Sequence, residues 1–265
     1  IPKELAEKMN ITIVPLYVLF GKDTYRDGID IRPDEFYEMQ GKSDELPKTS
    51  QPSVGEFTAV YEELLNDYDE IISIHISSGL SGTVNAALRA KEQFGNKVKV
   101  VDSKTISLGI GLQVMEAARK AIKGINSERI INRIEEIKNK SELLFTLDTL
   151  KYLEKGGRIG KVSSLLGSFL NIKPIVRVVD GIYVPAGKTR SQRQSIVKIV
   201  EIMETFLENR KPEAIVIGHG KGYEMALELK RQVEDRFEKA VDFLTDTGPV
   251  IGVHTGPGTL GIAFY

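Results

Sequence analysis

Short apolar runs that alternate with helix-like stretches are the feature that most restricts the fold of this chain. The strand-like runs are 11–20, 71–76, 98–101 and 143–147. The helix-like stretches are 54–66, 84–94, 106–123 and 128–139. Strands that alternate with helices of ten or more residues favour βαβ units with parallel strands. We therefore predict an α/β/α lobe with a mainly parallel sheet over residues 1–147.

The second part of the chain begins with a hairpin signal. Asp180-Gly181 separates two strand-like runs, and both central positions of the favoured two-residue turn need a positive φ. The predicted strands of this part are 172–179, 182–186, 214–218, a short one near Val241, and 260–264, and its predicted helices are 192–209 and 223–237. Antiparallel pairing beside helices predicts a mixed α+β lobe over 148–265, so the fold class is α/β with two lobes.

The composition excludes several classes of function. Lys and Arg (36) nearly balance Asp and Glu (37), and the formal charge of -1 argues against binding to nucleic acid or an anionic membrane. The absence of cysteine removes disulfides, thiolate nucleophiles and thiolate metal sites. The apolar run 11–20 contains Pro15 and is shorter than the roughly 20 residues that a spanning helix needs. We expect a cytoplasmic protein without stable membrane insertion. Because the sequence opens with Ile1 and not Met, we also expect an upstream segment.

The turn after the run 71–76 is rich in hydroxyl groups and glycine. Residues 77–83 read SSGLSGT, and a helix-like stretch follows at once. Free N–H groups and the dipole at a helix N-terminus favour an anion, and the hydroxyls add donors. Two other interpretations stay open. Ser78 or Ser81 caps the helix, or Ser81 is a nucleophile, since the turn resembles a nucleophile elbow with Thr83 in place of the last glycine.

Thr49 lies in a segment where it has no local structural task. Ser53 and Glu56 already form a capping box for the helix-like stretch 54–66, and Thr49 lies four residues before that cap. A loop hydroxyl without such a task is a candidate for contact with a ligand.

Two glycine-rich segments carry the remaining candidates. Arg158 lies among the glycines of 156–160, where a planar guanidinium suits a carboxylate or phosphate; the alternative is a solvated arginine after a helix C-terminus. His254 lies in a glycine-rich turn and can donate to an anion or titrate near neutral pH. His75, inside an apolar strand, is expected to be a core residue, and His219 stays ambiguous.

Standard nucleotide and metal motifs are missing from the sequence. Residues 256–261 match GxGxxG, but only four residues follow, so no helix can receive a pyrophosphate. There is no GxxxxGK[ST] phosphate loop, and three scattered histidines without cysteine give no metal-ligand spacing. We therefore expect no nucleotide, metal or other cofactor.

Taken together, five segments resemble those of the DegV family. They are TSQPS at 49–53, SSGLSGT at 77–83, DS at 102–103, YLEKGGRIG at 152–160 and HTGPG at 254–258. The resemblance covers nearly the whole chain, in order and with family-like spacing. One departure is that family members usually start with a strand and a TDST-like turn that borders the site, and this sequence begins just after it.

The resemblance implies a lipid-binding function. Some family members, called FakB, are the fatty-acid-binding subunits of bacterial fatty acid kinase, with one long-chain fatty acid buried between two lobes. It implies that Thr49, Ser81 and His254 bind the carboxylate and that Arg158 lies next to the carboxylate or phosphate. A separate ATP-dependent kinase subunit would phosphorylate the bound acid for phospholipid synthesis, so this chain would not itself be an enzyme.

Two other functions and the position of the acyl tail stay open. The chain can be a Ser81-dependent acyl hydrolase, or a binding or regulatory protein for another small anionic ligand. The tail pocket is not readable from the sequence. Four residues can line it, although ordinary core packing is the preferred interpretation: Leu165, Leu166, Phe169 and Leu170.

Overall fold

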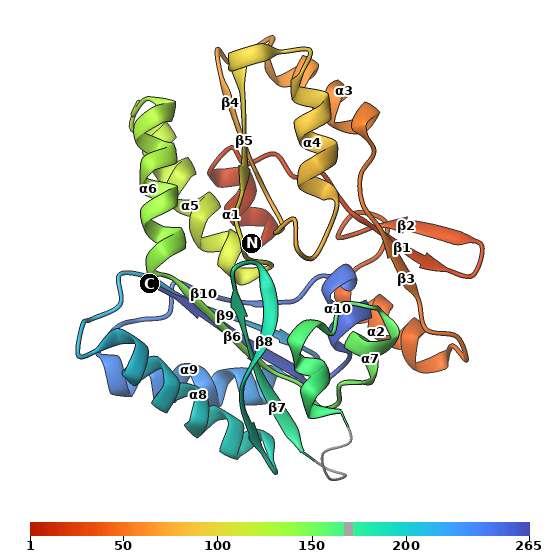
Figure 1. Ribbon diagram of the computed structural model, residues 1–265, viewed down its shortest axis with the longest axis vertical. Helices are drawn as coiled ribbons and strands as arrows, with labels where there is room; N and C mark the ends of the chain where they lie inside the picture. The colour runs from red at the N-terminus through yellow and green to blue at the C-terminus, as the bar shows by residue number, and fades with distance from the viewer. Residues whose placement is uncertain (167–171) are drawn as a thin grey trace.

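The computed structural model describes residues 1–166 and 172–265, and two small sheets form its first part (Figure 1). One is antiparallel, in the order β2-β1-β3, with β1 Tyr17–Phe20, β2 Asp23–Arg26 and β3 Lys48–Ser50. The other is the parallel pair β4 Ile71–His75 and β5 Val98–Asp102. The helices of this part are α1 Lys3–Lys8, α2 Pro33–Lys42, α3 Val54–Leu64, α4 Thr83–Lys91, α5 Leu108–Ile122, α6 Ser127–Lys140 and the short 3-10 helix η1 Gly95–Lys97.

A six-stranded sheet forms the centre of the second part, in the order β10-β9-β11-β6-β7-β8. Its strands are β6 Glu142–Thr146, β7 Lys173–Val179, β8 Ile182–Thr189, β9 Ile215–Gly220, β10 Phe243–Asp246 and β11 Thr259–Phe264. The helices around it are α7 Lys151–Lys155, the 3-10 helix η2 Gly160–Leu165, α8 Gln192–Leu207, α9 Tyr223–Phe237 and α10 Pro249–Thr255.

Helix α5 connects the two parts because it packs on both sheets. Leu108 and Leu112 of α5 join one core with Phe145 of the six-stranded sheet, whose opposite face is covered by α8 and α9 (Figure 1). Ala117, further along α5, packs with Val101 of the β4–β5 pair, and α3 and α4 cover the other side of that pair. The cavity described below lies at the N-terminal end of α5.

The predicted fold class is confirmed, and so are several of its parts. The strands β4 and β5 are parallel, as the βαβ pattern predicts. The β7–β8 hairpin turns at Asp180 and Gly181, whose φ angles of 51° and 81° are the positive values that the turn requires. Within the described part of the chain, no helix is both long and apolar enough to cross a bilayer.

Two expectations about the first part are wrong. Only Tyr17–Phe20 of the run 11–20 is a strand, because the segment before it contains Pro15, which has no N–H to donate to a ladder. This strand pairs antiparallel with β2 and β3, not parallel as predicted. The boundary at 147 falls after β6, yet β6 lies in the six-stranded sheet between β11 and β7, where all five of its residues are buried. The second part therefore begins before residue 142.

Candidate functional site

Thr49 and His254 lie side by side although 205 positions separate them in the sequence. Thr49 is the middle residue of β3 and lies opposite Val18 of β1. Its Oγ1 is 2.9 Å from Nε2 of His254, which comes from α10. The hydrogen bond is possible because α10 packs on the first part, where Val250 and Val253 join a core with Val18. The structure thus brings two of the predicted site residues into direct contact.

His254 lies in a helix, which corrects its predicted place in a turn. Pro249 is the first residue of α10, and Gly256 ends the helix with a φ of 72°. Proline at the start and glycine after the end are usual helix boundaries, so the residues that indicated a turn are in fact the ends of a short helix. His254 lies in its last turn, with its side chain partly buried.

The burial of His254 determines how its imidazole is protonated. Burial, with a smaller contribution from the charge of Arg158, lowers the pKa of His254 to about 4, so the ring is neutral at pH 7. Its Nδ1 is buried and has no hydrogen-bond partner among the described residues. A buried N–H without an acceptor is costly, which favours the tautomer with hydrogen on Nε2. The imidazole then donates to Thr49 Oγ1, and the Thr49 hydroxyl keeps its own hydrogen for an acceptor outside the pair.

Arg158 lies beside His254 and is exposed. Its Nη1 donates to the carbonyl oxygen of Gly156 at 2.8 Å. Gly156 in turn lies against the imidazole, where a Cβ built on the glycine would overlap Nδ1 of His254. The segment between α7 and η2 therefore fixes both the ring edge of His254 and the guanidinium next to it.

Ser81 is linked to this group only indirectly. Its Oγ accepts a hydrogen bond from the amide of Thr83 at 3.3 Å and lies 2.8 Å from Thr83 Oγ1, at the start of α4. The side chain of Gln51, two residues after Thr49, lies against Gly82, where a Cβ would overlap it. No contact of Ser81 with Thr49, Arg158 or His254 is found among the described residues. The N-cap residue of α4 is Gly82, so neither Ser78 nor Ser81 is the cap, although Ser81 binds the amide of the first helical residue, Thr83.

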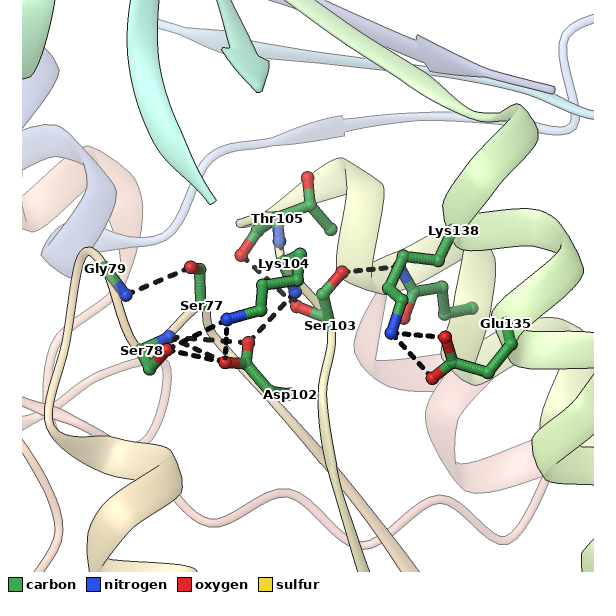
Figure 2. Close-up of polar contacts among 10 residues, drawn as sticks. Ser77, Ser78, Gly79, Asp102, Ser103, Lys104, Thr105, Glu135 and Lys138 are labelled. Atoms are coloured by element: carbon green, nitrogen blue, oxygen red, sulfur yellow. Dashed lines mark hydrogen bonds and ion pairs between the residues drawn. The ribbon is translucent and has the colours of Figure 1, made fainter. Parts of the chain in front are cut away.

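The turn that carries Ser81 is held by a contact with the β7–β8 hairpin, which we call the hairpin contact. Figure 2 shows Ser78 and Lys104 converging on Asp102, with Ser78 Oγ donating to the carboxylate at 2.6 Å and Lys104 Nζ lying 2.8 Å from it. Gly181 at the hairpin tip lies against Ser77 and Lys104. Ser77 also accepts the amide of Ser81 at 3.1 Å through its carbonyl oxygen. The second part therefore supports the Ser81 turn without contacting Ser81 itself.

We expect Gly181→Ala to destabilise the protein by about 2 kcal/mol. A Cβ at this position would overlap Ser77 Oγ, and a left-handed φ alone costs an alanine roughly 1 kcal/mol. Gly124→Ala is the matched control, because Gly124 has a φ of 71° with nothing within 4 Å of the added Cβ. Urea unfolding of both variants measures the difference. Equal losses would show that the hairpin contact adds no stability.

The neutral state of His254 predicts an acid-sensitive fold. The folded pKa of about 4 lies below the usual histidine value of 6.5, so between these values the unfolded chain binds a proton that the folded protein does not. Stability is therefore lost as pH falls from 6.5 to 4, by roughly 2–3 kcal/mol for this group. His75, which was expected in the core, is half-buried in β4, and desolvation lowers its pKa to about 4 as well. Unfolding curves at several pH values should show a smaller acid loss for His254→Gln than for the wild type; identical pH dependence would contradict this account.

A mostly apolar cavity lies between the N-terminal end of α5, the six-stranded sheet and α10. Its empty space amounts to about 360 Å³, a volume that includes open solvent. Its lining consists of Ile106, Ser107, Leu108, Leu143, Phe145, Tyr183, Thr247, Ile251, Thr255, Thr259 and Gly261. Two of the lining residues, Ile251 and Thr255, belong to the same short helix as His254, although Thr49, Ser81, Arg158 and His254 do not themselves line the cavity.

Two residues that contact the predicted site segments, Gln51 and Gly156, were not predicted from the sequence. Gln51 lies in the same TSQPS segment as Thr49 and Gly156 in the same glycine-rich segment as Arg158, so the motifs indicated their region but not their contacts. The residues proposed for the tail pocket are not those of the cavity: Leu165 packs in the core around Phe145 and Leu166 is 40% exposed. Phe169 and Leu170 lie outside the described residues.

Comparison with known proteins adds an independent observation. A family model described as "Uncharacterised protein, DegV family" matches residues 1–265. Protein DegV of Bacillus subtilis (strain 168) is 36% identical over 266 residues, which cover 100% of this chain and 95% of that protein.

Solved structures agree with this match. A DegV family protein from Thermus thermophilus, described as binding a fatty acid, has a TM-score of 0.95 at 33% identity, with 100% of this chain and 95% of that chain covered. A protein from Eubacterium ventriosum, described as binding stearic acid, has a TM-score of 0.92 at 29% identity, with 99% and 94% covered. The family model and these relatives together establish that the chain belongs to the DegV family.

Proposed function

We propose that the protein binds a long-chain fatty acid between its two parts and holds the carboxylate with Thr49, Ser81 and His254. The observation that carries this proposal is the hydrogen bond between Thr49 and His254, which leaves the threonine hydroxyl free to donate, while α10, the helix of His254, also contributes Ile251 and Thr255 to an apolar cavity. The relatives from Thermus thermophilus, Bacillus subtilis and Eubacterium ventriosum, described as fatty-acid-binding proteins, support the same ligand class.

The energetics of a buried acid fit these residues. A tail of about sixteen carbons contributes on the order of 10 kcal/mol when it is buried, before the costs of association. A carboxylate taken from water without partners is heavily penalised, so it needs several donors at once. The hydroxyls of Thr49 and Ser81 are such donors, and the neutral imidazole of His254 acts through Thr49, whose hydroxyl it leaves free to donate.

The direct test is to extract the purified protein with organic solvent and identify the lipid by mass spectrometry. We expect a long-chain fatty acid in the extract, and binding of added acid to the delipidated protein. A protein that carries no fatty acid and binds none on addition would overturn the proposal. A non-lipid anion recovered from the same site would favour a family member that has changed its ligand.

We further propose that the bound carboxylate is presented to a separate ATP-dependent kinase subunit for acyl-phosphate formation. Arg158 is exposed beside the buried His254, where a guanidinium can stabilise the charge of a phosphoryl group in transfer. The sequence itself contains no phosphate loop, so the nucleotide would come with the partner.

Arg158→Ala should therefore retain fatty acid binding but lose at least about 10-fold in acyl-phosphate formation by a fatty acid kinase subunit. Arg129→Ala, at an exposed arginine on α6 far along the sequence from the site segments, is the control and should leave both measurements unchanged. Normal acyl-phosphate formation by the Arg158 variant would show that the guanidinium does not assist the transfer.

The alternative of a Ser81 acyl hydrolase makes a different prediction. A serine nucleophile needs a base within hydrogen-bond reach, but the Ser81 hydroxyl pairs with Thr83, and Nε2 of His254 pairs with Thr49. A hydrolase would form a covalent adduct with a fluorophosphonate probe that Ser81→Ala abolishes. We expect no adduct in either protein.

A further inference from the structure

Helix α10 belongs to the second part of the chain, but residues of the first part contact its start, its middle and its end. Figure 1 shows α10 beside α2, and a Cβ built on Gly252 in the middle of α10 would lie 2.5 Å from the ring of Phe36. At the end of α10, Thr49 bonds to His254. At its start lies the carboxylate of Asp27, for which the proposed function has so far given no role.

Asp27 supplies an acceptor that α10 lacks in its own sequence. The N-cap position is occupied by Gly248, which has no side-chain oxygen, and the first helical residue is Pro249, which has no N–H. A Cβ built on Gly248 would lie 2.9 Å from Oδ1 and 3.1 Å from Oδ2 of Asp27. The amide of Val250 lowers the pKa of Asp27, as a donor that faces a carboxylate does. A side chain of the first part thus caps a helix of the second.

The small antiparallel sheet fixes Asp27 in this place. The residue follows β2 directly, and its amide donates to the carbonyl of Leu16, just before β1, at 2.8 Å. Thr49 belongs to β3, which pairs with the other edge of β1. Burial raises the pKa of Asp27 to about 6, against the effects of the Val250 amide and the Ile1 amino group. The carboxylate is therefore poorly hydrated, and a neutral acceptor of the same shape fits its position.

We propose that Asp27 is a positioning residue of the carboxylate site, which fixes the start of α10 on the small sheet and so keeps His254 within reach of Thr49. Helix α10 has only seven residues, and a helix of this length is not stable without tertiary contacts. A displacement of its first turn is therefore transmitted to its last turn, which carries the imidazole. Asp27 itself does not touch the ligand. This inference rests on the proposed function and adds to it a residue that acts through His254.

The test compares two substitutions of Asp27 in the delipidated protein. Asp27→Ala removes the acceptor and should weaken fatty acid binding about 5-fold, whereas Asp27→Asn keeps an acceptor oxygen and should bind within about 2-fold of the wild type. In the ligand-free protein, the NMR signals of the His254 ring should move in Asp27→Ala and stay in place in Asp27→Asn. Asn126→Ala is the matched control, because Asn126 caps α6 by accepting the amide of Arg129 at 3.0 Å. It removes a helix cap outside the site and should change neither measurement.

Gly248→Ala tests the same contact from the side of α10. The φ of Gly248 is -61°, which alanine adopts without strain, so the added methyl group acts only by displacing the carboxylate of Asp27. It should weaken binding and move the His254 signals in the same direction as Asp27→Ala. Signals that stay in place in both variants would overturn the proposal, and so would an Asp27→Asn protein that binds as weakly as Asp27→Ala.

A double substitution separates positioning from a general loss of stability. In Thr49→Val the bond to His254 is already absent, so adding Asp27→Ala should lower the remaining affinity by less than about 2-fold. A further loss as large as that of Asp27→Ala alone would also overturn the proposal, because Asp27 would then act independently of this pair. If the wild-type protein binds no fatty acid, the proposed function itself fails, and the ring signals of the ligand-free variants still show whether Asp27 positions His254.

Discussion

Replacing Thr49 by valine is expected to weaken fatty acid binding by about 100-fold. Valine keeps the shape of the side chain but removes the hydroxyl that receives the imidazole N–H of His254 and donates onward. A hydrogen bond to a charged group contributes roughly 1.5–3 kcal/mol, and its loss leaves both the carboxylate and Nε2 of His254 without a partner. Titration calorimetry with the delipidated variant measures the loss.

Thr205→Val is the control for this substitution. Thr205 of α8 also donates its hydroxyl to one partner, the carbonyl of Glu201 at 2.9 Å, but it lies on an exposed helix outside the site. It should bind the fatty acid as the wild type does. If Thr49→Val binds as tightly as Thr205→Val, the threonine hydroxyl does not hold the carboxylate.

Gly156→Ala is expected to reduce binding at least as strongly, although residue 156 need not touch the ligand. The φ of Gly156 is -76°, which alanine adopts without strain, so the effect comes only from the added methyl group. That methyl would overlap Nδ1 of His254 and lie 3.0 Å from the carbonyl oxygen of Tyr152. The imidazole must turn away, and the bond between Nε2 and Thr49 is then lost. We expect a loss of at least about 100-fold in affinity, from two missing hydrogen bonds.

Gly157→Ala separates this steric effect from a general effect on the loop. Gly157 has a φ of 69° and nothing within 4 Å of an added Cβ, so alanine there costs backbone energy but does not displace His254. It should lower stability by roughly 1 kcal/mol and leave the affinity unchanged. The NMR signals of the His254 ring should move in Gly156→Ala and stay in place in Gly157→Ala. Unchanged signals in both variants would contradict the predicted displacement.

Local patterns predicted the elements of the fold better than their pairing. The hairpin at Asp180-Gly181 and the helix 223–237 follow from short-range rules of turn geometry and helical spacing, and both are present. The place of β6 in the six-stranded sheet depends on contacts with β7 and with β11, which lies more than a hundred residues away. No local pattern contains that information, so the predicted boundary at 147 was wrong.

The candidate site shows the same difference between local patterns, which the sequence reveals, and long-range contacts, which it does not. Segments with unusual glycine and hydroxyl content pointed to Thr49, Ser81, Arg158 and His254, and the structure puts Thr49 and His254 in contact, with Arg158 near enough for its charge to act on the ring. The contact of Gly156 with His254 arises only when distant elements pack, and a glycine at that position is ordinary in the sequence. Core packing was the preferred interpretation of Leu165, and the structure confirms it, because an apolar residue next to a motif packs into a core as readily as it lines a cavity.

The position of β11 has a consequence for the synthesis of the protein. This strand lies between β9 and β6, antiparallel to both, and all six of its residues are buried. Until residues 259–264 have left the ribosome, no strand connects β6 with β9, so the six-stranded sheet stays in two separate halves. The cavity wall that Thr259 and Gly261 supply is therefore missing while earlier parts of the chain fold during translation. The cavity is complete only after nearly all of this sequence has been translated.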